Sequence, residues 1–135
     1  MEIRKSTFDY LPGLIEYEGN VVRINFDVEQ IELANMDSNA GKKTSRKAYA
    51  AHVVRISQPV TRDKVIDAIV SEAYPTDKMQ AIINNHFVNL GVVADGGTLK
   101  DADELAHEEE YVAMQEWRKK AKSVASDVMA ELSNR

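Results

Sequence analysis

The spacing of apolar residues changes once along the chain, near Pro59, and this change constrains the fold most. Before it, Val22, Ile24, Phe26 and Val28 alternate with polar residues, which is the period of a half-buried strand. After it, apolar residues recur at steps of three and four, the period of helices. The order predicts an α+β fold in which an N-terminal antiparallel sheet of three to four strands is followed by an αα-hairpin and a long C-terminal helix.

Residues 1–58 are expected to be mainly strands. Residues 14–18 are typical of a strand that precedes the alternating segment across Gly19-Asn20, a pair that tolerates the positive φ of a hairpin turn. After Val28 the apolar phase slips by one residue, which predicts a bulge near Glu29-Gln30 or a new strand. Residues 49–56 are expected to form a further strand, and the polar residues 35–47 a loop before it.

Residues 60–91 are expected to form two helices. Thr61 is the expected N-cap of the first helix, and Pro75 is expected to stop it. Thr76 is the expected cap of the second helix, and Gly91 stands where a terminating glycine belongs. The expected apolar face of the second helix comprises Met79, Ile82, Ile83, His86, Phe87 and Leu90.

Residues 101–133 are expected to form one long helix whose acidic residues precede its basic ones, as the helix dipole favours. Such a helix spans about 45 Å, whereas a small sheet is only about 20 Å across. Its apolar stripe therefore predicts an interface with a second copy or a partner helix, through Met114, Trp117, Ala121, Val124, Val128 and Leu132. The alternative is a break near Lys122-Ser123 that folds the helix back over its own sheet.

The charges are unevenly distributed along the chain. The formal net charge is −5, which disfavours nonspecific binding to nucleic acid or to an anionic membrane. A basic cluster nevertheless stands in the polar loop, and it is a candidate partner-binding site composed of Lys42, Lys43, Arg46 and Lys47. An acidic partner is the ligand that such a cluster favours.

Composition and the chain start narrow the class of protein further. At 135 residues a single domain spanning residues 1–135 is expected, and it needs no disulfide or metal to fold. There is no cysteine, which excludes disulfides, thiol catalysis and thiolate metal sites. The first residues do not resemble a signal peptide, and no stretch reaches the roughly 20 apolar residues of a membrane span. We therefore expect a cytoplasmic protein without a membrane partner.

Each candidate motif for catalysis, a cofactor or a metal lacks a residue that the motif requires, so no catalytic residue and no cofactor is predicted. Gly41-Lys42 resembles part of a phosphate-binding loop, but Lys43 stands where Ser or Thr is required. His107-Glu108 begins a zinc-protease pattern, but its second histidine position is Tyr111. The histidines fall on different expected elements. A small hydrolase built from scattered carboxylates and His52 is the least favoured hypothesis.

The two helices within residues 61–90 have the length of a helix-turn-helix, which suggests a nucleic-acid-binding regulator that also uses residues 42–47. Asn84 and Asn85 on the second helix are residue types that read adenine edges. Against this, residues 62–90 hold three Lys and Arg side chains and four Asp and Glu side chains. Because phosphate contacts supply most of the affinity for DNA, an ordinary helical hairpin is favoured.

The helical part resembles small uncharacterised proteins of gut Bacteroides and their prophages. The resemblance lies in residues 63–70, 77–86 and 110–120, and the stretch Tyr111-Val-Ala-Met-Gln-Glu-Trp-Arg118 is also similar to accessory proteins of phage structural modules. It implies an assembly or accessory role and no catalytic residue. The leading hypothesis is therefore a non-enzymatic interaction protein that binds a protein partner or itself, and the nucleic-acid-binding regulator is the alternative.

Overall fold

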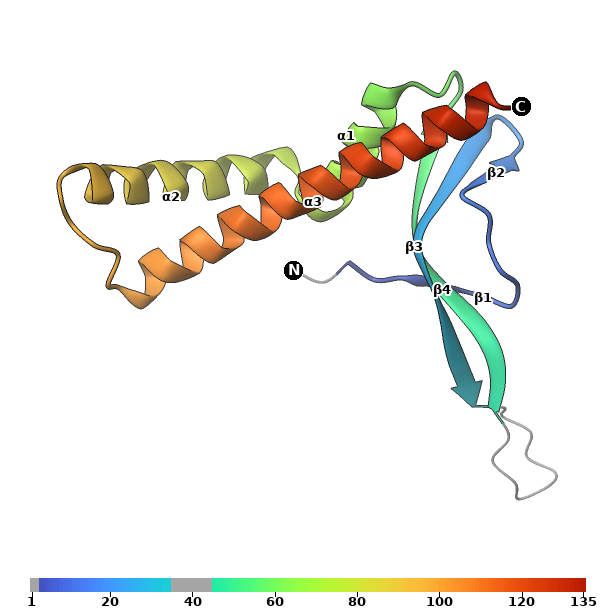
Figure 1. Ribbon diagram of the computed structural model, residues 1–135, viewed down its shortest axis with the longest axis horizontal. Helices are drawn as coiled ribbons and strands as arrows, with labels where there is room; N and C mark the ends of the chain where they lie inside the picture. Colours follow the sequence, from blue (N-terminus) through green and yellow to red (C-terminus); the bar gives the residue numbers. More distant parts are fainter. Residues whose placement is uncertain (1–2, 35–44) are drawn as a thin grey trace.

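The computed structural model describes residues 3–34 and 45–135, as a four-stranded antiparallel sheet followed by three helices (Figure 1). The strands are β1 (Ser6–Phe8), β2 (Ile15–Glu18), β3 (Val21–Ala34) and β4 (Ser45–Ser57), in the spatial order β1-β4-β3-β2. The helices are α1 (Arg62–Ala73), α2 (Thr76–Ala94) and α3 (Ala102–Ser133). The predicted α+β fold is confirmed.

The expected hairpin joins β2 to β3. Glu18 pairs with Val21, so Gly19 and Asn20 form a two-residue turn. Gly19 supplies the positive φ of +64° that this tight turn requires, a conformation that glycine adopts without steric cost. The hairpin sets the register that places Ile15 beside Ile24 on the buried face of the sheet.

The apolar phase slip in β3 is a β-bulge, located two residues earlier than predicted. The pairing of β3 with β4 shifts between Phe26 and Glu29, and Asp27 adopts a φ of +51°. Aspartate is one of the few residues besides glycine that enters this left-handed region readily. The carboxylate of Asp27 lies 2.8 Å from Nζ of Lys120 in α3, so the bulge is tied to the long helix.

The hydrophobic core lies between one face of the sheet and the helices. Val22, Ile24 and Phe26 of β3 alternate inward, as the period of two predicts, and all are buried. The same core takes Val54 and Ile56 from β4 and Val65, Ile69 and Val70 from α1. Thr61 caps α1 as predicted, since its hydroxyl accepts a hydrogen bond from the Lys64 amide.

Both ends of α2 differ from the prediction. Thr76 is the first residue of the helix and not its cap, because the N-cap position is Pro75, which has no side chain that can accept a hydrogen bond. At the other end the helix continues through Gly91 to Ala94. The terminating glycine is Gly96, with a φ of +83°. The amide of Gly97 donates to the carbonyl of Val92, and that of Gly96 to the carbonyl of Val93. This pair of bonds is a Schellman motif, which the glycine pair at 96–97 can form.

The helix α3 is continuous, so the alternative break at Lys122-Ser123 is wrong. With 32 residues it is about 48 Å long. Its second half packs against α1 and the sheet, whereas its first half runs beside α2, away from the sheet (Figure 1). We call this two-helix projection, formed by residues 76–94 and 102–118, the arm.

The position of the core on α3 predicts that two matched substitutions on that helix change the free energy of unfolding by very different amounts. Val128 is fully buried and Val112 is 52% exposed. Val128→Asp places an uncompensated charge in the core and should reduce the free energy of unfolding by about 3–5 kcal/mol. Val112→Asp should change the free energy of unfolding of the single chain, measured at concentrations too low for association, by no more than about 0.5 kcal/mol. Urea unfolding of both variants measures the difference, and equal midpoints would contradict the placement of the core.

Candidate interaction surface

The two helices of the arm are joined by polar contacts. Nδ1 of His86 lies 2.9 Å from a carboxylate oxygen of Glu108, and the His86 ring stacks on Tyr111 with centroids 3.5 Å apart. The buried side chain of Asn89 donates to the backbone carbonyl of Glu104 at 2.8 Å. These contacts fix α2 against α3 where no sheet supports them. His86 is thus a partly buried histidine with a bonded ring, as its position suggested.

The arm carries most of the exposed apolar side chains of the described residues. Of ten large hydrophobic side chains that are exposed there, six lie on the arm. They are Phe87, Val88, Leu90, Val93, Leu105 and Val112, exposed by 47% to 68%. Single exposed apolar residues are normal on protein surfaces, but a concentration of them on one projecting element is typical of an interaction site.

Two shallow grooves organise these side chains. One, of about 350 Å³, brings Phe87 and Leu90 of α2 together with Gln115 and Arg118 of α3. The other, of about 460 Å³, runs along α3 between Leu105 and Val112. His86 lines the first groove and Glu108 the second, so the pair that bonds across the arm also joins the two grooves.

The charges of α3 are separated along its length. Residues 101–110 carry six Asp and Glu side chains, and residues 118–122 carry four Lys and Arg side chains. Asp101 caps the helix by accepting from the Asp103 amide, and Asp103 and Glu104 stand in the first turn. The helix dipole favours these acids there. The free end of the arm is therefore negatively charged, at residues 101–110, and the end nearer the sheet is positively charged, at residues 118–122.

The predicted oligomer-interface residues lie inside the protein. Met114, Ala121, Val124 and Val128 are buried in the core of their own chain, and Trp117 and Leu132 are partly buried against it. They are therefore not available to a second chain, and this assignment of the interface is wrong. Its physical cause is that α1 and the sheet cover the second half of α3, whereas the excess length lies in the first half.

The basic cluster is only partly described. Lys42 and Lys43 lie outside the described residues. Arg46 and Lys47 belong to β4 rather than to a loop, and the guanidinium of Arg46 forms an exposed ion pair with Asp9 at 2.8 Å. A role for the cluster in partner binding stays a prediction.

The predicted helix pair at 61–90 is not arranged as a compact unit. α1 packs against α3 and β4, whereas α2 turns away at Pro75 and runs along α3 (Figure 1). Val65, Ile69 and Val70 are buried in the core, so α1 is a structural element of the sheet layer. Nucleic-acid binding through these helices stays a prediction.

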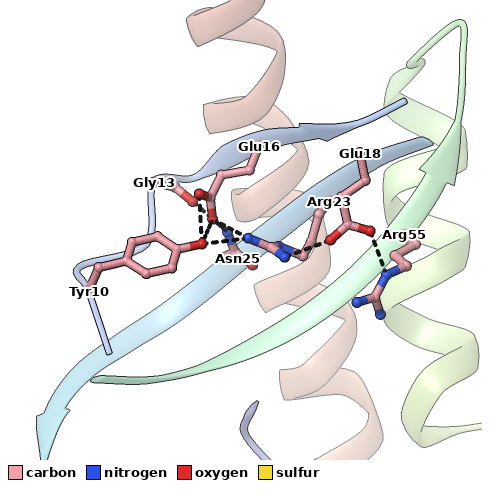
Figure 2. Close-up of polar contacts among 7 residues, drawn as sticks. All are labelled: Tyr10, Gly13, Glu16, Glu18, Arg23, Asn25 and Arg55. Carbon is pink, nitrogen blue, oxygen red and sulfur yellow. Dashed lines mark hydrogen bonds and ion pairs between the residues drawn. The ribbon is translucent and has the colours of Figure 1, made fainter. Parts of the chain in front are cut away.

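A cluster of polar side chains covers part of the sheet face opposite the helices, and Figure 2 shows it with α3 behind the strands. The Arg23 guanidinium donates to Glu16 at 2.7 Å, to Glu18 at 2.6 Å and to the Tyr10 hydroxyl at 2.8 Å. Asn25, 1% exposed, donates to Glu16 at 2.6 Å. The cluster ties β2 and the β1–β2 connection to β3.

Glu16 and Glu18 are two carboxylates that accept from the same guanidinium, that of Arg23. Burial opposes ionisation of Glu16, but hydrogen bonds from Arg23 and Tyr10 and the charge of Arg23 hold its pKa below the usual value. A hydrogen bond from Arg55 leads the causes that lower the pKa of Glu18. Both groups are therefore carboxylates at neutral pH and lack the raised pKa of a general acid. The arrangement suits a structural ion-pair network.

The three histidines have different surroundings. His52 packs its ring against Phe26 and Trp117, His86 stacks on Tyr111, and His107 stands on α3. Among residues 3–34 and 45–135, no three His, Asp or Glu side chains form a group that could hold a metal ion. In the same two ranges, none of the helices combines the length and the apolar composition that crossing a membrane requires.

No family model, no curated protein and no solved structure matches this chain. The resemblance to Bacteroides and prophage proteins therefore stays a prediction. The sequence did not predict the exposure of Phe87 and Leu90, because both residues fit the expected buried face of their helix. Leu105 and Val112 stand seven residues apart, a helical spacing, but they lie outside the stripe that continues to Leu132.

The ion-pair network predicts a pH dependence of stability. The folded-state pKa of Glu16 is lowered, so its stabilisation is present above the ordinary carboxylate pKa of about 4.3 and is lost as the pH falls through the lower folded-state value. Thermal unfolding should therefore show a loss of stability below about pH 5 that is shallower in Glu16→Gln. Arg23→Gln should flatten the profile in the same way. A wild-type slope in both variants would contradict the role of this pair.

Proposed function

We propose that this protein is a non-enzymatic assembly protein that pairs with a second copy of itself through the arm. The observation that carries the proposal is the concentration of exposed apolar side chains on α2 and the first half of α3. The arm holds no sheet and little core of its own. A second copy would cover the apolar grooves on its surface and gain the free energy of removing them from water.

The charge pattern of α3 supports a second copy as the partner. In an antiparallel pair, the acidic residues 101–110 of one helix lie beside the basic residues 118–122 of the other. A parallel pair would place like charges together, which electrostatic repulsion disfavours. The centre of such a pair falls near residue 114, within the stretch of α3 that carries Val112.

Two-fold pairing also fits the position of the grooves. A two-fold interface uses the same patch on both copies, so the patch must be complementary to itself. Phe87 and Leu90 lie toward one side of the arm and Leu105 and Val112 follow α3, which offers apolar surface from both helices to a second arm. The sheet and its polar cluster stay free in such a dimer and can contact a further partner, as an accessory protein requires.

The proposal predicts a dimer whose formation depends on the arm. Light scattering at micromolar concentrations should give twice the chain mass of 15.1 kDa. Phe87→Asp and Val112→Asp each place a charge in the apolar interface and should weaken the dimer at least about tenfold. Because acidic and basic segments meet in the interface, higher salt should also weaken it.

Leu11→Asp is the matched control. Leu11 is 65% exposed and lies on the β1–β2 connection, outside the arm, so this variant should remain dimeric. The circular dichroism spectra of all three variants should equal that of the wild type. A wild-type mass of one chain at these concentrations, or a dimer that Leu11→Asp disrupts as strongly as Phe87→Asp, would contradict the proposal.

A further inference from the structure

A third groove lies closer to the sheet than the two grooves of the arm, and it meets the groove between Leu105 and Val112 at Ala113 of α3. Its volume is about 620 Å³, and it opens where the N-terminal segment, β4, the end of α1 and α3 meet. Pockets of roughly 300–1,000 Å³ are typical of small-molecule sites in proteins. The floor includes Tyr74 and Trp117, and the rim carries Lys5 and Lys120.

The aromatic floor is held in a fixed position. The indole Nε1–H of Trp117 donates to the carbonyl of Ile69 at 2.8 Å. The ring of His52 stands edge-on to that indole at 5.4 Å, and the ring of Phe26 lies 5.9 Å from it. Tyr74 is 7% exposed. A ligand that packs on this floor therefore meets a surface that needs little rearrangement.

The two lysines are positioned by carboxylates behind the rim. Nζ of Lys5 lies 3.4 Å from Glu29, and Nζ of Lys120 lies 2.8 Å from Asp27 at the bulge. An ammonium group has three donors, so each lysine can also donate to an anion in the groove. The one carboxylate on the rim, Glu116, is engaged with Lys119 on the exposed side of α3.

His52 adds a neutral polar group to the same wall. Burial is the main cause that lowers the pKa of His52, and the positive charges of Lys5 and Lys120 act in the same direction against Asp27 and the Arg4 carbonyl. The imidazole is therefore neutral at neutral pH. Its Nδ1 is buried without a hydrogen-bond partner among the described residues. A polar atom of this kind costs free energy unless something satisfies it.

We propose that this groove binds a small carboxylic acid with an apolar body, the carboxylate between Lys5 and Lys120 and the apolar body on Trp117 and Tyr74. The lining carries two ammonium groups and one carboxylate, and each lysine, although paired with a carboxylate behind the rim, has further N–H donors that an anion can accept from. The aromatic and alanine surface below the lysines selects an apolar body.

Trp117 is the single tryptophan of the chain, so its fluorescence and its one indole NMR signal report on this groove alone. The probes are decanoate, decanol and decylamine, which share an apolar chain and differ in the charge of the head group. Decanoate should give a saturable change of both signals, and decylamine should give none. Decanoate should also raise the pKa of His52, because a nearby anion favours the imidazolium form.

Lys5→Gln and Lys120→Gln should each weaken decanoate binding about two- to fivefold, the effect of one partly exposed charge. Lys122→Gln is the matched control, since Lys122 is an exposed lysine of the same helix outside the lining of the groove, and it should bind as the wild type does. Val112→Asp should also bind normally, because the groove does not depend on the proposed dimer. The proposal would be overturned if all three probes gave the same titration curve with the wild type. It would also be overturned if both lysine variants bound decanoate as tightly as the wild type, or if decanoate changed neither Trp117 signal.

Discussion

The rest of the structure depends on the packing of one half of α3 against the sheet and α1. Met114, Ala121, Val124, Ala125 and Val128 recur at helical spacing and are buried on that seam. Burying side chains of this size supplies the main free energy of folding. Because α3 is about 48 Å long and the sheet of four strands only about 20 Å wide, this packing can hold only part of the helix. The remaining length becomes the arm, and α2 follows it.

Polar contacts then determine how the seam is oriented. Trp117 is bonded to the end of α1 through the Ile69 carbonyl, and Lys120 is bonded to Asp27 at the β-bulge. These two anchors lie one helical turn apart and tie α3 to two separate elements. The bulge is therefore more than an irregularity of pairing, because its left-handed residue directs a carboxylate toward the helix. The same two anchors, Trp117 and Lys120, line the groove that Lys5 and His52 complete.

Local patterns were sufficient to predict the elements but not their coverage. The period of two in β3, the Gly19 turn and the Thr61 cap each depend on neighbours in the sequence, and each is present. The stripe from Met114 to Leu132 was also real, but periodicity does not show which partner covers it. The sequence therefore pointed to the covered part of α3 as an interface and did not single out Leu105 and Val112, which the structure shows to be exposed. Gly91 and Gly96 posed a similar choice, since a glycine within a helix looks the same in sequence as one that ends it.

The charge of the arm has a feature that the fold itself does not explain. The helix dipole accounts for acids in the first turn of α3, but its effect falls off beyond that turn. Glu108, Glu109 and Glu110 lie in the second and third turns, where neighbouring like charges repel. Glu108 is bonded to the His86 ring within the arm, whereas Glu109 and Glu110 stand on exposed surface. Such a run weakens an isolated arm and is relieved by a basic segment placed beside it. In the dimer that we propose, residues 118–122 of the second copy would provide that segment, so the charge pattern and the exposed apolar side chains favour the same partner.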